Sequence, residues 1–347
     1  MNLQENIPLA PMTTFQVGGP ARYFVAAATV EDVREAVEYA REKRLPLFVL
    51  GGGSNLIVSD AGWPGLVSKV GITGISHHQG RSRIFDAGAG EEWDKLVALA
   101  VSHQCAGIEC LSGIPGSVGG TPVQNVGAYG QEVSETIECV QALDRKTLEV
   151  VQLSKEDCGF QYRTSIFNTS QRERYIILRV SYRLTFRGEP KLAYADLKKY
   201  FAGWATPPTL AQVREAVREI RASKGMLIRP DDEDCRSAGS FFKNPVLTAE
   251  EHTMLEKKAS ERGLKVPSYP ALEARRKVSA AWLVEHSGFA KGYSNGKVGI
   301  SRKHALALVN RGGAKSSDIV AFKDEIQDRV EEIWGVRLQS EPVFVGF

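Results

Sequence analysis

Two glycine-dense stretches constrain the fold of this chain more than any other feature. The first, LGGGSNLIV at residues 50–58, directly follows an apolar run (46–50) that is typical of a buried strand. The second, residues 113–132, shows neither helical nor strand periodicity. Ordering so long a stretch costs much conformational entropy, so we expect a ligand to help order it. Together the two stretches predict two loops around one extended, phosphate-bearing cofactor.

The first glycine run has the chemistry of an anion-binding turn. Glycines carry no Cβ atom, so the backbone can approach a ligand closely, and successive N–H groups in such a turn form an anion-binding concavity. Ser54 and Asn55 add side-chain donors. The run is neither a GxGxxG fingerprint nor a Walker A loop, because no lysine follows the glycines and no clear helix begins there. Taken alone, it is equally compatible with a tight turn that holds no ligand.

The second stretch adds side chains that suit an organic cofactor. Gln124, Asn125 and Tyr129 supply hydrogen-bonding and stacking groups among the glycines, while Pro115 and Pro122 restrict the backbone. The alternative is an ordered surface loop. The presence of both stretches in one chain favours the cofactor.

Size and composition are those of an ordinary globular protein. The chain has 347 residues, enough for two or three domains, and is 43% hydrophobic and 24% charged. A net charge of +3 with interspersed acids and bases argues against a nucleic-acid partner. We expect neither a membrane segment nor a signal peptide. The five cysteines form no CxxC pair and no His/Cys cluster, so we expect no metal and a reducing cytoplasm.

Helical and strand patterns alternate along the chain without regular βαβ spacing, so we expect an α+β fold. The polar segment 225–236, which contains Pro230 and an acidic run at 231–234, is interpreted as a linker or surface insertion. Helices are predicted at 29–43, 92–103, 209–224, 248–262, 278–287 and 316–333, and strands at 46–50, 175–186, 297–300, 305–309 and 336–345.

A set of ordered motifs makes the chain recognisable. They are TTFQVGGPA (13–21), LGGGSNLIV (50–58), IPGSVGGTPVQNVGAYG (114–130), YRTSIF (162–167), AGSFFKNP (238–245) and SEP (340–342). Together they resemble the UDP-N-acetylenolpyruvoylglucosamine reductase (MurB) family from about residue 5 to the C-terminus. YADLKKYF (194–201) further resembles the subgroup whose tyrosine-bearing loop closes over the substrate.

The resemblance implies a vanillyl-alcohol-oxidase (PCMH)-type FAD-binding module of two subdomains, residues 1–70 and 71–224. A C-terminal α+β substrate-binding domain (225–341) would follow, with strand 342–347 rejoining the first subdomain. FAD would be noncovalent, because no histidine lies in the glycine loops. The residues expected to contact FAD are Gly51, Gly52, Gly53, Ser54, Asn55, Leu56, Pro115, Gly116, Gly119, Gly120, Gln124, Asn125, Gly127, Ala128 and Tyr129.

The implied reaction is reduction of UDP-N-acetylglucosamine enolpyruvate to UDP-N-acetylmuramate in peptidoglycan synthesis, with NADPH as co-substrate. Arg163 matches the family's arginine that stabilises charge on the substrate carboxylate. Ser240 matches the general acid that protonates carbon, and Glu341 matches a glutamate beside the carboxylate. Without the resemblance, these residues would be interpreted as a surface ion pair, a turn residue and a charge on a terminal strand.

Further matches concern the substrate. Tyr194, Lys224 and Asn244 match family positions that contact the UDP part, and Lys243 is a weaker match. His304 falls where relatives often have glutamine, which leaves one substrate contact open. The proline of SEP follows Glu341, whereas relatives often have a proline before the glutamate. The acidic run 231–234 would repel a diphosphate, so we expect it at the surface, away from the pocket, and Cys235 has no expected role.

Two other functions stay open at this point. The first is another FAD-dependent oxidoreductase of the same superfold that acts on a sugar or alcohol, which would not account for Arg163, Ser240 and Glu341 together. The second is a non-enzymatic module that binds flavin or a UDP-sugar. A Ser-His-Asp hydrolase is disfavoured, because the chain has no GxSxG motif. We expect a monomer with a small UDP-sugar as its partner.

Overall fold

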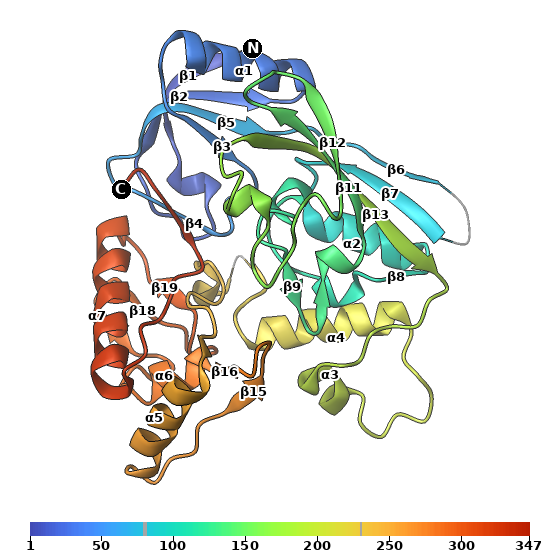
Figure 1. Cartoon of the computed structure of the whole chain (residues 1–347). Helices are drawn as coiled ribbons and strands as arrows, with labels where there is room; N and C mark the ends of the chain where they lie inside the picture. The colour runs from blue at the N-terminus through green and yellow to red at the C-terminus, as the bar shows by residue number, and fades with distance from the viewer. Residues whose placement is uncertain (79–81, 230) are drawn as a thin grey trace. The chain divides into compact units, whose positions relative to one another are not determined.

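The computed structural model describes residues 1–78, 82–229 and 231–347, and its cartoon is shown in Figure 1. The chain divides into two compact units. The first unit comprises Met1–Ile7, Pro20–Gly53 and Trp63–Ser223, and the second comprises Pro8–Gly19, Ser54–Gly62 and Lys224–Phe347. Neither unit is one continuous stretch of chain. The three-part division at residues 70 and 224 stays a prediction.

A four-stranded sheet with the order β1-β2-β5-β3 opens the first unit. Its strands are β1 (Leu3–Pro8), β2 (Pro20–Ala27), β5 (Trp63–Val70) and β3 (Leu47–Leu50), and β5 runs parallel to both β2 and β3. Helix α1 (Val30–Glu42) packs against β2 and β5 (Figure 1). Thr29 and Asp32 form a capping box at its start.

The larger sheet of the first unit is antiparallel and is built around β13 (Tyr175–Phe186). The predicted alternation of this strand places Ile176, Leu178, Val180, Tyr182 and Leu184 in the core. Its strands follow the order β12 (Val150–Ser154), β11 (Ile137–Asp144), β13, β7 (Ser82–Gly88) and β6 (Ile75–His78), and β8 (Cys105–Ala106) also pairs with β13.

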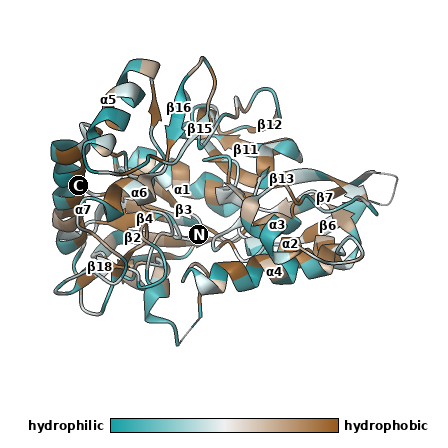
Figure 2. Ribbon diagram, turned by 90° about the horizontal axis from the view of Figure 1, so that it is seen from below, coloured by the Kyte–Doolittle hydropathy of each residue, from teal (hydrophilic) through white to brown (hydrophobic). Residues whose placement is uncertain are grey.

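Three helices and a small hairpin complete the first unit. Helix α2 (Trp93–Ser102) contacts α4 (Leu210–Ser223), and the short α3 (Ala195–Tyr200) also packs on α4. Figure 2 shows α4 banded in hydrophobic and hydrophilic colours, as expected of an amphipathic helix whose Val213, Ala216 and Val217 are buried. The hairpin of β9 (Gly127–Ala128) and β10 (Gln131–Glu132) ends the second glycine stretch.

The second unit combines small sheets with three helices around its own core. Its longest helix, α7 (Ser316–Trp334), buries Ile319, Phe322, Ile326, Val330 and Trp334 on one face. The helices α5 (Ala249–Ser260) and α6 (Ala280–Glu285) accompany it. The strands are β14 (Val246–Leu247), β16 (Arg276–Val278) and β15 (Ser268–Pro270), then β17 (Ser294–Asn295), β18 (Val298–Ile300) and β19 (Leu308–Asn310), and the parallel pair β4 (Leu56–Val58) and β20 (Val343–Val345).

The α+β fold is confirmed, and each predicted helix is present within two residues of its expected ends. Two strand predictions are too long. The strand expected at 305–309 is Leu308–Asn310, because residues 304–307 form a turn in which the Ala307 amide donates to the His304 carbonyl. The strand expected at 336–345 is only Val343–Val345, because Pro342 has no amide to continue a ladder.

Candidate active site

The two glycine stretches touch each other in the first unit. A Cβ atom on Gly52 would lie 2.5 Å from Cα of Gly116, and one on Gly51 would lie 3.0 Å from Oγ of Ser117. A Cβ on Gly119 would lie 2.6 Å from that of Ala89. The approaches at Gly52 and Gly119 are closer than a side chain tolerates. These glycines are therefore required for the two loops to take their places.

The same loops carry backbone donors that suit a phosphate. In the described part of the chain, the amides of Gly52, Gly53 and Ser54 have no hydrogen-bond partner. Unpaired N–H groups in succession are the usual means by which a glycine-rich turn binds an anion. A Cβ on Gly120 would meet no atom within 4 Å, so this end of the second loop borders open space. The residues present thus fit a phosphate-bearing cofactor such as FAD.

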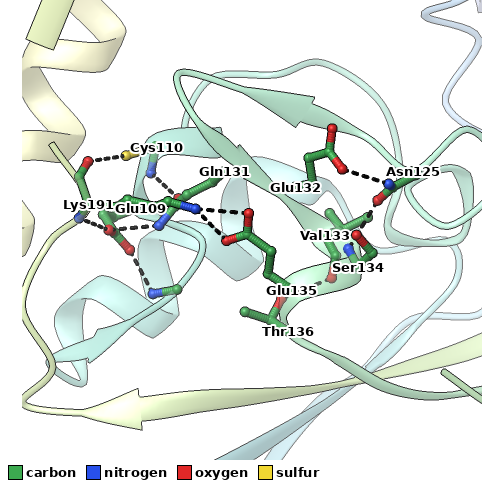
Figure 3. A network of polar contacts seen from close by, with 11 residues as sticks. Glu109, Cys110, Asn125, Gln131, Glu132, Val133, Ser134, Glu135, Thr136 and Lys191 are labelled. Carbon is green, nitrogen blue, oxygen red and sulfur yellow. Dashed lines mark hydrogen bonds and ion pairs between the residues drawn. The ribbon is translucent and has the colours of Figure 1, made fainter. Parts of the chain in front are cut away.

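Asn125 is only 1% exposed, and its side chain makes its hydrogen bonds inside the first unit, while its contact with the cofactor stays a prediction. Its Nδ2 donates to Oε2 of Glu132 at 2.9 Å and to the Gln161 carbonyl at 3.1 Å. Its Oδ1 accepts from the Ser134 amide at 3.1 Å (Figure 3). The bond to Glu132 lies within the glycine stretch, and the bonds to Gln161 and Ser134 connect this stretch to neighbouring segments.

Glu109 forms the other centre of this polar network, and nothing in the sequence indicates it. Its fully buried carboxylate accepts from Gln131 Nε2 at 2.8 Å and from the Lys191 amide at 3.0 Å (Figure 3). The Lys191 ammonium pairs with Glu135 at 2.8 Å. Since Lys191 precedes Tyr194 by three residues, the network anchors the start of the segment that carries this tyrosine.

Three residues other than glycine adopt left-handed backbone conformations in this region. They are Asn125 (φ +44°), Tyr129 (φ +49°) and Arg163 (φ +60°). Asparagine tolerates this conformation, whereas tyrosine and arginine adopt it only where their surroundings hold them in place. Strain of this kind is concentrated at functional sites.

Arg163 lies in a tight turn whose two ends bond to each other. The Gln161 amide donates to the Thr164 carbonyl at 3.0 Å, and the Thr164 amide donates back at 3.1 Å. The Arg163 guanidinium donates through Nη2 to the Gly127 carbonyl at 2.8 Å. Arg163 is partly buried, and the structure places it against the predicted FAD-binding residue Gly127.

Tyr129 and Tyr194 also lie together in the first unit. Their rings meet edge to face with centroids 5.4 Å apart. Tyr129 is buried, whereas Tyr194 is 44% exposed. The predicted cofactor loop and the predicted substrate tyrosine are therefore in contact.

Three arginines of α4, Arg214, Arg218 and Arg221, help to connect the second glycine stretch to α2. Asp94 accepts from Arg214 at 2.6 and 2.8 Å, from Arg218 at 2.7 Å and from the Gly113 amide at 2.6 Å. Burial alone would raise the pKa of Asp94, but the bonds from Arg214 and Gly113 lower it overall. Arg221, further along the helix, donates to the Gly113 carbonyl at 3.1 Å. Sequence reasoning missed this cluster, because Asp94 and its arginines are distant in the chain.

Ser240 and Glu341 are brought close together by the backbone of the second unit. The Glu341 amide donates to the Phe241 carbonyl at 2.8 Å, and Phe242 and Ser340 form an isolated antiparallel bridge. Among the described residues, the Ser240 hydroxyl makes no hydrogen bond. Asn55 joins this group through Nδ2, which donates to the Glu341 carbonyl at 3.2 Å. The predicted acid, the predicted carboxyl group and one FAD-loop residue thus share a neighbourhood.

His304 lies in the same part of the second unit. Its Nδ1 accepts from the Leu306 amide at 3.1 Å, and the Leu306 carbonyl accepts from the Phe241 amide at 2.8 Å. Burial, followed by the charges of Lys224 and Lys291, lowers the pKa of His304 to about 4. His304 is therefore neutral at neutral pH, with its ring proton on Nε2.

Asn244 has a structural bond as well as its predicted role. Its Oδ1 accepts from the Ala280 amide at 2.9 Å, at the start of α6. No hydrogen bond of its Nδ2 group is found within the described residues. This donor remains available to a ligand.

The acidic segment differs from the expectation of a surface insertion. Asp234 is only 4% exposed and accepts from Ser301 Oγ at 3.0 Å and from the Arg302 amide at 2.9 Å. Asp232 pairs with Lys303 at 2.7 Å. The expectation that these acids all lie at the surface is wrong, because two of them hold the turn at residues 301–303. Pro230 lies outside the described residues.

The described residues contain no group of three or more histidine, cysteine or acidic side chains that could hold a metal ion. Within the same ranges, no helix has both the length and the hydropathy that crossing a bilayer requires.

Comparisons with known proteins give matches to both halves of the chain. The FAD binding domain family matches residues 21–152, and the family described as UDP-N-acetylenolpyruvoylglucosamine reductase, C-terminal domain, matches residues 230–345. The UDP-N-acetylenolpyruvoylglucosamine reductase of Thermobifida fusca is 44% identical, over 98% of this chain and 97% of that protein. The reductase of Streptomyces coelicolor is 45% identical, over 98% and 89%.

A solved structure gives the same result at the level of the fold. The crystal structure of the reductase from Thermus caldophilus is 26% identical in sequence and covers 99% of both chains with a TM-score of 0.68. The matches therefore extend over the whole chain and include both glycine stretches.

Proposed function

The chain belongs to the UDP-N-acetylenolpyruvoylglucosamine reductase family, and from this premise we propose which of its residues perform each step of the reaction. The enzyme is an FAD-dependent oxidoreductase that uses NADPH to reduce UDP-N-acetylglucosamine enolpyruvate to UDP-N-acetylmuramate in peptidoglycan synthesis. It is a UDP-N-acetylmuramate dehydrogenase, and we propose that its FAD-binding module is of the vanillyl-alcohol-oxidase type.

The touching glycine loops are proposed to hold the FAD diphosphate. Gly52, Gly53 and Ser54 offer unpaired amides, and the backbone around Gly116, Gly119 and Gly120 forms the opposite side. When bound, FAD supplies the hydride that reaches the enolpyruvyl carbon. The side chains of Gln124 and Tyr129 and the backbone of Ala128 are proposed to complete the contacts.

Arg163 is proposed to stabilise the charge that develops on the substrate. Hydride addition to the enolpyruvyl group makes an intermediate with extra negative charge on its carboxylate oxygens. A guanidinium fork matches two carboxylate oxygens, and its charge is strongest where water is excluded. The bond from Arg163 Nη2 to the Gly127 carbonyl supports this role, because it gives the guanidinium a fixed direction.

Ser240 is proposed to deliver the proton that completes the reduction. A serine hydroxyl is a weak acid, but the carbon it protonates is strongly basic at that moment, so position matters more than acidity. Because the Ser240 hydroxyl makes no hydrogen bond among the described residues, it can donate to a substrate without breaking an existing bond. Glu341, tied to the adjacent Phe241 backbone, is proposed to hold the substrate carboxylate while sharing a proton with it.

The UDP part is proposed to bind Tyr194, Lys224 and the Asn244 amide, with His304 as a neutral donor through Nε2. Lys224 and Lys291 lie near His304 in the second unit, and such a cationic environment suits a diphosphate. The exposed Tyr194 is proposed to close over the substrate, as in the subgroup that the sequence resembles. We also propose a monomer that works in the cytoplasm, where NADPH and UDP-sugars are found.

The observation that carries these assignments is the contact between the two glycine loops, which only glycine permits at Gly52. The deciding experiment follows the flavin absorbance of the purified enzyme by anaerobic stopped flow. NADPH should bleach the flavin, and the UDP-enolpyruvyl sugar should then restore the oxidised spectrum quickly. If simple sugars or alcohols restore it equally well, the alternative oxidoreductase is correct.

The acid assignment has its own test in the same apparatus. Ser240→Ala should retain the flavin colour and the NADPH step, while the substrate step slows by about 10²–10⁴-fold, as expected for loss of a positioned acid. Ser240→Cys, which restores a proton donor of similar size, should recover part of the rate. A substrate step in Ser240→Ala at the wild-type rate would exclude Ser240 as the acid.

A further inference from the structure

We propose that Asn125 is a positioning residue that aims the Arg163 guanidinium, and this inference rests on the proposed role of Arg163. Asn125 does not itself touch the reacting atoms in this scheme. It acts through the turn at residues 161–164, whose first residue lies 36 positions further along the chain.

The first observation is that one buried amide connects three segments. Asn125 is 1% exposed, and its side chain bonds Glu132 on β10, the Ser134 amide after β10 and the Gln161 carbonyl. Its backbone is in the left-handed region, at φ +44°. A buried polar group of this kind stabilises one arrangement strongly, because any loss leaves unpaired partners.

The second observation concerns the turn that this amide holds. Gln161 and Thr164 close the turn by two mutual bonds, and the Gln161 carbonyl also receives Asn125 Nδ2. Between them Arg163 is held at φ +60°, a conformation that arginine does not adopt without support. On the other side, Asn168 Nδ2 donates to the Arg163 carbonyl at 3.2 Å. The turn is therefore fixed from both sides.

The third observation is that the Arg163 guanidinium bonds to the glycine stretch that contains Asn125. Arg163 Nη2 bonds to the carbonyl of Gly127, only two residues after Asn125. A Cβ atom on Gly127 would lie 3.1 Å from Arg163 Nη1, so glycine leaves room for the fork. Asn125 thus fixes the backbone of the turn, and Gly127 fixes the tip of the side chain. Both contacts set the direction of Arg163 relative to the second glycine stretch.

Asparagine is the side chain that fits this position. It combines two N–H donors with one acceptor, and all three are used here, by Gln161, Glu132 and Ser134. A carboxylate in its place would have the same shape but no donor. It would face the Glu132 carboxylate and the Gln161 carbonyl with negative charge, so the turn should move away from it.

The test compares the two half-reactions of Asn125→Asp across a range of pH. At neutral pH, the rate of the substrate step should fall at least tenfold relative to the rate of flavin reduction by NADPH. As the pH falls, the introduced carboxylate takes up a proton and regains a donor, so the ratio should recover. Adding Glu132→Gln removes the like charge, and the recovery should then begin only at lower pH.

Asn310→Asp provides the matched control. Asn310 is also buried, at 4% exposed, and bonds the Phe15 carbonyl and the amides of Gly312 and Ala314 within the second unit. Its replacement should destabilise the protein comparably without changing the ratio of the half-reactions or its pH dependence. If Asn125→Asp does not fold, Asn125→Ser offers a smaller change that should shift the ratio in the same direction.

Two outcomes separate this inference from the proposed function. If Arg163→Ala leaves the substrate step unchanged, Arg163 lacks its proposed role whatever Asn125 does. If Arg163→Ala slows the substrate step but Asn125→Asp behaves like Asn310→Asp, Arg163 keeps its role and the positioning role of Asn125 is wrong. A ratio that falls without recovery at low pH would also overturn the inference.

Discussion

The surroundings of His304 determine the tautomer and the protonation state of its ring. The Leu306 amide occupies Nδ1, so the neutral ring keeps its proton on Nε2. Burial and the two lysines, Lys224 and Lys291, oppose a second proton and lower the pKa to about 4. A glutamine could present a similar N–H donor but would not titrate. The sequence identified position 304 but left open whether His304 contacts the substrate, because the protonation state of the ring depends on residues distant in the chain.

This state predicts a dependence of stability on pH. Unfolded His304 has an ordinary pKa of about 6.5, whereas the folded group titrates at about 4. The unfolded chain therefore binds more protons between these values, so stability is lost as the pH falls from about 6.5 towards 4. Urea unfolding of His304→Gln at several pH values should show a smaller loss over this window than the wild type. Equal slopes for the two proteins would contradict the low pKa.

At the scale of elements, the two glycine loops are joined by close contacts that a methyl group would break. Gly52→Ala should force Gly116 and Ser117 away and abolish FAD binding, as measured by the flavin content of the purified protein. Gly71→Ala is the control in the same unit, because its Cβ would meet only the Ala27 carbonyl, at 3.5 Å. A Gly52→Ala protein that is still yellow, and therefore still holds FAD, would contradict the proposed FAD site between the two loops.

Gly120→Ala tests the position of the cofactor along the same loop. A methyl group at Gly120 meets no protein atom within 4 Å, so the fold should tolerate it. The affinity for FAD should nevertheless fall, because the open space is proposed to hold the cofactor. Titration of the apoprotein with FAD measures this, and unchanged affinity would place the cofactor elsewhere.

The link between α2 and α4 also makes a prediction. Asp94→Asn removes the charge that Arg214 and Arg218 share, leaving two partly buried guanidinium groups without a counter-charge. We expect a loss of about 2 kcal/mol in the free energy of unfolding, less than for a fully buried pair. Glu138→Gln is the control, because its pair with Arg183 is exposed and should contribute little. Urea denaturation of both variants checks the difference.

The sequence predicts these elements unequally. Helices such as α1 and α7 follow from their own periodicity and caps, so their ends were close to the prediction. The strands β2 and β5 were not located, because their parallel pairing joins distant segments that carry little local signal. The acidic segment was misplaced because Asp234 bonds to Ser301, which is 67 residues away.

At the scale of the whole molecule, two hydrophobic cores share one chain, and ligand binding adds to the stability that they provide. A ligand that binds only the folded protein stabilises it by mass action, by about 2.7 kcal/mol at a hundredfold excess over its Kd. Thermal unfolding of the apoprotein should therefore shift upward on adding FAD, whereas Gly52→Ala should not respond. An equal shift in both would indicate binding elsewhere.

The sequence also predicts the candidate site unevenly. Motifs identified Arg163, Ser240 and Glu341, and the structure accounts for the surroundings of each within its own unit. The supporting groups were missed, among them Glu109 and Asp94, because a buried carboxylate is recognised only by its partners in space. The contact between Asn125 and the cofactor stays a prediction, and the bonds of its buried side chain were not foreseen, since a sequence does not reveal which bonds a side chain makes.

The pairing of β20 with β4 has a consequence for biosynthesis. Residues 56–58 leave the ribosome early, whereas their partners at 343–345 are made much later. Throughout most of translation the nascent second unit therefore has an unpaired strand edge, which is open to misassociation. The first unit, by contrast, has all its segments once residue 223 has emerged, and it can begin to fold while synthesis continues.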